Sequence, residues 1–167
     1  MTLFKKTKKG SRAVLAAACL LITSTAAAKN CSLSFAATPA AQTLQLTLAA
    51  PQHVMVGTLT QDCKKTSRYT LVVESANCPL SPAGAKLMNQ LSGEFVRYSV
   101  EFDNKTTRGG IDVVAQLLAQ NCAAQVARDE HSAYGLRRSD VFLDFTGALM
   151  LAEGTYSDTL SVTININ

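Results

Sequence analysis

The sequence has few of the residues from which catalytic or metal-binding sites are built. It contains only two histidines, His53 and His131, and none of its five cysteines stands in a Cys-x-x-Cys pair, so the usual zinc spacing is missing. Gly109-Gly110 is not followed by Lys-Ser or Lys-Thr, which excludes a phosphate loop of that type. We therefore predict no catalytic residue, metal or cofactor.

Long apolar runs are also missing. The run from Ala13 to Ile22 is too short to span a membrane. No later apolar stretch approaches the length that a membrane-spanning helix needs. Five basic residues precede this run, and the small residues 25–28 follow it, an order typical of a secretory signal peptide. We predict that residues 1–28 are a signal peptide, and that residues 29–167 form one exported domain without a membrane anchor.

A net positive charge is missing from the predicted mature chain. The full sequence has 16 Lys and Arg against 12 Asp and Glu, a formal net charge of +4. Residues 1–28 hold five of the basic residues and no acidic one, so 11 basic against 12 acidic residues remain, a net charge of −1. The basic footprint expected of a nucleic-acid-binding protein is therefore absent.

Four cysteines remain after the predicted cleavage: Cys31, Cys63, Cys78 and Cys122. An even number of cysteines in an exported chain predicts two disulfides. Four cysteines allow three pairings, and the spacing does not choose among them.

Alternating apolar and polar residues predict about six or seven short strands joined by turns, which is typical of an all-β sandwich. Residues 77–93 show no period and predict a loop, and residues 128–139 predict a charged loop. Residues 113–127 fit either a helix or an irregular sheet edge. The predicted strands are 31–35, 43–48, 54–60, 68–74, 95–102, 141–145 and 160–167.

The last predicted strand has the clearest alternation. Its apolar positions are Leu160, Val162, Ile164 and Ile166, and the turn residues Gly154 and Ser157-Asp158 lead into it. Such a pattern indicates a half-buried strand. A strand of this kind lies either inside a complete sheet or at an edge whose neighbour comes from another chain.

This ending, Gly-Thr-Tyr-Ser-Asp-Thr-Leu followed by alternating Val and Ile, resembles the C-terminus of spore coat protein U domains and of archaic (Csu-type) chaperone–usher pilins. Two further segments are similar to that family. One is Cys-Ser-Leu-Ser-Phe at 31–35, and the other is a strand into Cys63, a polar turn at 64–67 and a strand at 68–73. The middle third of the mature chain shows no match.

The resemblance implies an immunoglobulin-like sandwich that lacks its last strand. A periplasmic chaperone, and then the N-terminal extension of a neighbouring pilus subunit, would fill the gap by donor-strand complementation. The subunit would pass through the periplasm and an usher into a fimbria at the cell surface. It implies a strand-acceptor groove formed by Leu160, Val162, Ile164 and Ile166. It implies Gly154, Tyr156 and Asp158 as family motif residues, Cys31–Cys63 as the family disulfide and Cys78–Cys122 as an additional one.

One feature departs from the family. Its members carry a donor segment before the first cysteine, whereas only Lys29 and Asn30 precede Cys31 after the predicted cleavage. A donor strand needs several alternating residues to cross a sheet. This subunit is therefore expected either to accept a strand without giving one or not to polymerise.

Two other functions stay open on the sequence. A complete, stand-alone secreted or periplasmic sandwich would bind a ligand or partner through its loops. A secreted hydrolase would need His53 or His131, or the pair Asp103 and Asp112 around the Gly-Gly turn. Neither set resembles a triad, whose members normally meet from separate segments, and carboxylates at turns usually serve the turn itself.

Overall fold

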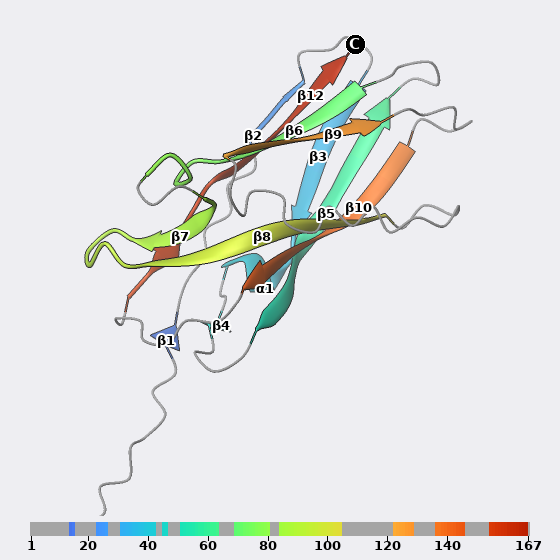
Figure 1. The fold of residues 1–167 in the computed structure, drawn as a ribbon. Helices are drawn as coiled ribbons and strands as arrows, with labels where there is room; N and C mark the ends of the chain where they lie inside the picture. Colours follow the sequence, from blue (N-terminus) through green and yellow to red (C-terminus); the bar gives the residue numbers. More distant parts are fainter. Residues whose placement is uncertain are drawn as a thin grey trace, which may run out of the picture.

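The computed structural model describes part of the chain as strands, turns and one short helix (Figure 1). The described residues are 14–15, 23–26, 31–42, 45–46, 51–63, 69–80, 84–104, 122–128, 136–145 and 154–166. Within them, no helix is long and apolar enough to cross a membrane. The elements are β1 (Val14–Leu15), β2 (Thr23–Ala26), β3 (Cys31–Ala37), α1 (Pro39–Gln42), β4 (Gln45–Leu46), β5 (Gln52–Cys63), β6 (Tyr69–Ser75), β7 (Lys86–Asn89), β8 (Phe95–Asn104), β9 (Ala123–Arg128), β10 (Leu136–Phe145), β11 (Tyr156–Ser157) and β12 (Leu160–Ile166).

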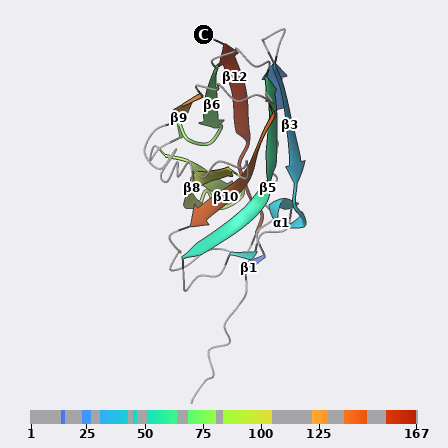
Figure 2. The ribbon, with the colours of Figure 1, turned by 90° about the vertical axis from the view of Figure 1, so that its right-hand side faces the viewer.

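Two sheets hold most of these strands. One has six strands in the order β11-β7-β8-β10-β5-β3, and the other has four in the order β2-β12-β6-β9. Figure 2 shows β12 and β6 on one side of the molecule and β3 and β5 on the other. The predicted all-β, sandwich-like fold is confirmed. The pairings are antiparallel except that of β12 with β2, which is parallel.

The hydrophobic core is one cluster that takes residues from both sheets. On β8 the residues Val96, Tyr98, Val100 and Phe102 are all buried, as the alternation predicted. The sheets also meet through a polar contact, because the hydroxyl of Tyr69 on β6 donates a 2.9 Å hydrogen bond to Gln61 Oε1 on β5.

Strand β5 carries a bulge that reverses which of its residues face the core. Its register with β10 shifts between Val141 and Phe142, which pair with Gly57 and Met55, so Val56 is left over. A bulge of this kind bends the strand and re-aims its side chains. As a result, His53 lies on the outer face near the start of the strand, while Leu59 beyond the bulge is fully buried.

Two expectations for secondary structure are wrong, and one that the sequence left open is decided. Residues 86–89, expected in a loop, form β7, which shows no alternation because Lys86, Leu87 and Asn89 are all buried. Of the two alternatives for residues 113–127, the sheet edge is the one found over 123–127, where β9 pairs with β6 as the last strand of its sheet. Residues 113–121 lie outside the described part. The loop expected over 128–139 contains the start of β10 at Leu136. Pairing with a neighbouring strand decided each case, overriding local propensity.

The predicted strand at 43–48 falls mostly outside the described residues. Only Gln45–Leu46 is described, as β4, and it pairs with β1. The strands expected at 31–35, 54–60, 68–74, 95–102, 141–145 and 160–167 are confirmed, with bounds shifted or extended by a few residues. Residues 68 and 167 themselves lie outside the described part.

Gly57 is the point at which a side chain would collide with the neighbouring strand. A Cβ added there would lie 2.2 Å from Phe35 Cζ and 2.6 Å from the backbone oxygen of Ala36. The aromatic ring could turn away, but the backbone of β3 would have to move. We expect Gly57→Ala to lower the free energy of unfolding by about 1–3 kcal/mol, measured by urea denaturation of the disulfide-bonded chain.

Thr60→Ala is the matched control, because Thr60 is half-buried on the outer face of the same strand. It should change the unfolding free energy by no more than about 0.5 kcal/mol. Equal stability of Gly57→Ala and the native chain would show that β3 does not approach β5 so closely.

Candidate functional site

The first candidate site is the edge of β12. On one side β12 pairs with β6 along its whole length, from Leu160 opposite Ser75 to Ile166 opposite Tyr69. On the other side it pairs in parallel with β2, from Ser161 opposite Thr23 to Ile164 opposite Ala26 (Figure 1). The position beside β12 is therefore filled by four residues of the same chain.

Those four residues belong to the predicted signal peptide. Among the described residues from 31 onward, β12 has only β6 as a neighbour in its sheet. Removal of residues 1–28 would leave backbone N–H and C=O groups of β12 without strand partners. Exposed groups of this kind pair readily with a strand from another chain.

The side chains predicted to form the acceptor groove point into the core. Leu160, Val162 and Ile164 are only 1%, 2% and 1% exposed. The side chain of Ile166 lies outside the described part. With β2 in place, β12 is thus an inner strand. Without β2, the edge of β12 would offer backbone groups, while these three side chains would still point into the core.

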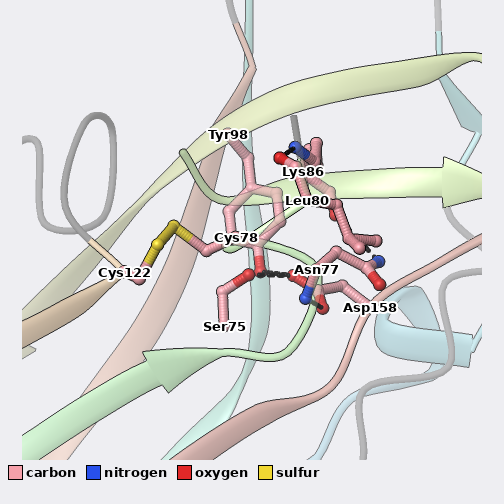
Figure 3. The surroundings of a disulfide bond; sticks show 8 residues. All are labelled: Ser75, Asn77, Cys78, Leu80, Lys86, Tyr98, Cys122 and Asp158. Atoms are coloured by element: carbon pink, nitrogen blue, oxygen red, sulfur yellow. Dashed lines mark hydrogen bonds between the residues drawn. A yellow bond between two sulfur atoms is a disulfide. The ribbon is translucent and has the colours of Figure 1, made fainter. Parts of the chain in front are cut away.

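The second candidate site is the buried carboxylate of Asp158, at the entrance to β12 (Figure 3). Asp158 is 4% exposed. Its Oδ2 accepts hydrogen bonds from the Ser75 hydroxyl at 2.6 Å and the Tyr98 hydroxyl at 2.5 Å. Its Oδ1 accepts from the backbone N–H of Asn77 at 3.0 Å and of Thr159 at 2.7 Å.

These four donors come from separate parts of the fold. Ser75 ends β6, Asn77 follows it in a turn, Tyr98 lies on β8 in the other sheet, and Thr159 directly precedes β12. A buried charge is stable only when hydrogen bonds replace its hydration. Asp158 therefore fixes the start of β12 against both sheets.

Asn77 extends this network to two further strands. Its side-chain amide donates to the carbonyl oxygen of Lys86 at 3.1 Å and to that of Ser157 at 2.7 Å. The next residue, Cys78, forms a disulfide with Cys122, which directly precedes β9. The turn that follows β6 is thus joined to β7 and β11 by hydrogen bonds, and to the residue before β9 by a disulfide.

Tyr98 is held in its neutral form. Burial raises the pKa of its hydroxyl well above the usual value, and the negative charge of Asp158 and the hydrogen bond to it raise the pKa further. A neutral phenol can donate a hydrogen bond to the carboxylate, whereas an ionised one would repel it.

Lys86 is a second buried polar group near this site. It is fully buried, its ammonium group donates to the carbonyl oxygen of Leu80, and Nζ lies 5.5 Å from the centre of the Phe95 ring. Desolvation lowers the pKa of Lys86, as does Arg97, while Asp158 raises it. We assign it a structural role in closing the turn after Cys78.

The other two motif residues also serve the corner that leads into β12. Gly154 has φ +153°, and a Cβ there would lie 2.5 Å from the side-chain nitrogen of Asn89. Tyr156 is fully buried, and its hydroxyl donates to Glu94 Oε2 at 3.0 Å. Gly154, Tyr156 and Asp158 therefore have a structural role: they hold the segment that leads into β12.

Both disulfides pair as the resemblance implied. Cys31 and Cys63 lie directly opposite each other on β3 and β5 and are bonded. Cys78 and Cys122 are bonded across 44 residues of sequence.

The residues considered for a hydrolase do not form a triad in the described part. His53 lies on the outer face of β5, and Asp103 lies on β8 opposite Asp140. His131 and Asp112 lie outside the described residues.

Neither a family model nor a curated protein matches this sequence.

Sequence reasoning selected Asp158 from the motif but missed its donors, because Ser75 and Tyr98 are 83 and 60 residues away. It also missed β2 as the neighbour of β12. A run of Thr, Ser and Ala beside the predicted cleavage site carries no strand pattern.

We expect Asp158→Ala to lower the free energy of unfolding by at least about 3 kcal/mol, because several buried donors lose their acceptor at once. Chemical denaturation of the oxidised chain measures this loss. Asp62→Ala, which removes an exposed carboxylate on β5, is the control and should be nearly neutral. Similar effects of the two substitutions would argue against an anchoring role for Asp158.

The raised pKa of Tyr98 makes stability depend on alkaline pH. Below the ordinary tyrosine pKa of 10.0, Tyr98 is protonated in the folded and unfolded states alike. Above that pH the unfolded chain loses the proton while the folded chain keeps it, so stability falls until the pH passes the folded pKa. Unfolding measured at pH 8 and pH 11 should show a smaller loss for Tyr98→Phe than for the native chain. Identical losses would contradict this.

Proposed function

We propose that this chain is an exported structural subunit of a chaperone–usher type surface fimbria, or a minor component of one, that assembles by donor-strand complementation. The single observation that supports the proposal most is the position of β12. Its only described neighbour from the predicted mature chain is β6, and the opposite edge is filled by four residues that signal cleavage would remove.

The segment that fills this edge is a weak occupant by its composition. Residues 23–26 are Thr-Ser-Thr-Ala, so β2 offers main-chain hydrogen bonds but no large apolar side chain. A partner strand with alternating large apolar residues would add side-chain burial to the same hydrogen bonds. We infer that such a strand, from a chaperone or neighbouring subunit, takes the place of β2 in the mature protein.

Two further features support this role. The disulfides suit a protein that matures outside the cytoplasm. The Asp158 network fixes the start of β12 to both sheets, so the strand would be held in place while its outer edge stays open. A strand acceptor needs such a rigid template, because order in the acceptor reduces the entropy cost of binding.

The alternative is a stand-alone secreted or periplasmic sandwich that binds a partner through its loops. The observation that favours it is the burial of Leu160, Val162 and Ile164 to 2% exposure or less, so these three side chains do not line an open apolar groove. This alternative requires residues 29–167 to be stable without an added strand.

The experiment compares residues 29–167, with both disulfides formed, alone and with synthetic peptides of alternating apolar residues taken from candidate partner subunits. We expect the isolated domain to self-associate or to melt at low temperature. A suitable peptide at 100 times its dissociation constant should add about 2.7 kcal/mol to the unfolding free energy. Light scattering and thermal denaturation measure the two effects.

The control is the same peptide with proline at a central position, which removes a backbone donor and blocks strand pairing. It should give no stabilisation. A monomeric domain that unfolds cooperatively and responds to no peptide would support the stand-alone sandwich and remove the mechanism proposed here.

A further inference from the structure

Three potential metal ligands meet on the outer face of the six-stranded sheet, away from β12. They are His53 on β5, Asp144 on β10 and Glu101 on β8. One ligand atom from each lies within 4.8 Å of the others. No local pattern in the sequence groups them, since His53 and Asp144 are 91 residues apart.

The strand register explains why these side chains meet. His53 pairs with Asp144 across β5 and β10, and Glu101 pairs with Phe142 across β8 and β10. On β10, Val141, Leu143 and Phe145 are buried in the core, so Phe142 and Asp144 between them face outward. The bulge at Val56 brings His53 to the same outer face.

The imidazole is held in place by two contacts. His53 Nδ1 lies 2.6 Å from Asp144 Oδ1, and the His53 ring stacks on the Phe142 ring with a centroid distance of 4.3 Å and an interplanar angle of 11°. The side chains of His53 and Asp144 are 49% and 36% exposed. The ligands are therefore ordered by the sheet yet open to an ion from solvent.

We propose that His53, Glu101 and Asp144 form a binding site for a divalent transition-metal ion of the zinc class. One imidazole nitrogen with two carboxylates suits such ions, whereas Ca²⁺ and Mg²⁺ prefer oxygen ligands alone. Zinc binds nitrogen and oxygen at about 2.0–2.2 Å in tetrahedral geometry, so two ligand atoms on one ion lie about 3.3–3.6 Å apart. Side-chain rotations of the partly exposed ligands would bring the observed spacing of up to 4.8 Å to that value, and the remaining coordination position would take water.

A bound ion would link three neighbouring strands, β5, β10 and β8, from their solvent side. It would replace the hydrogen bond between His53 and Asp144. Because the ligands need the folded register to meet, binding would stabilise the folded state in proportion to ion concentration. This site does not depend on the role of β12.

The test is isothermal titration of the full chain, untagged and with both disulfides formed, with zinc chloride and separately with calcium chloride. We expect one zinc ion per chain and no calcium binding. His53→Gln should abolish zinc binding, and Asp144→Asn and Glu101→Gln should each weaken it. Thermal unfolding without metal checks that each variant is folded, which the partial exposure of all three side chains favours.

Two matched controls accompany these variants. His131→Gln removes the other histidine of the chain, and Asp103→Asn removes a carboxylate two residues from Glu101 on the same strand. Both should bind zinc as the native chain does. The proposal is overturned if the native chain binds no zinc, if any of the three ligand variants binds it with native affinity, or if His131→Gln abolishes binding.

Discussion

The buried carboxylate of Asp158 is the interaction on which the arrangement of the two sheets depends most. It accepts four hydrogen bonds, from Ser75, Asn77, Tyr98 and Thr159. Burying a charge is costly unless its hydration is replaced, and here the replacements come from β6, β8 and the entrance to β12. The position of the strand is thereby set by groups that meet only when both sheets are formed. The nearby disulfide between Cys78 and Cys122 holds the same turn covalently.

This anchoring would help β12 to act as the acceptor in strand exchange. A strand that is fixed at one end, buried on its core face and paired on one side presents its remaining edge as an ordered template. In the full chain that edge is covered by β2 over four residues. A longer strand with larger side chains would make the same type of hydrogen bonds and bury more apolar surface. The proposed fimbrial function follows from this asymmetry between a well-fixed acceptor and a short, polar occupant.

The sequence predicted the parts of the fold that depend on local pattern. Alternation identified β8 and β12, because each has one face in the core and one outside it. It failed at β7, where Lys86 and Asn89 are buried with Leu87, since a strand covered on both faces has no period. It could not choose between helix and sheet edge for β9, because the Ala and Gln residues suit a helix, and pairing with β6 decides for the strand. The motif indicated Asp158, but its partners, and the meeting of His53 with Asp144, depend on long-range register that no local pattern encodes.

The most direct test of an open acceptor edge is hydrogen exchange at the backbone amides of residues 161–164, compared between the full chain and residues 29–167. Pairing with β2 should protect amides of β12 that face it in the full chain. Without residues 1–28 these amides should exchange faster, while amides of β6 keep their protection, and an added partner strand should restore the slow exchange. Equal protection in the two chains would show that β12 has no edge to offer, and would contradict the account.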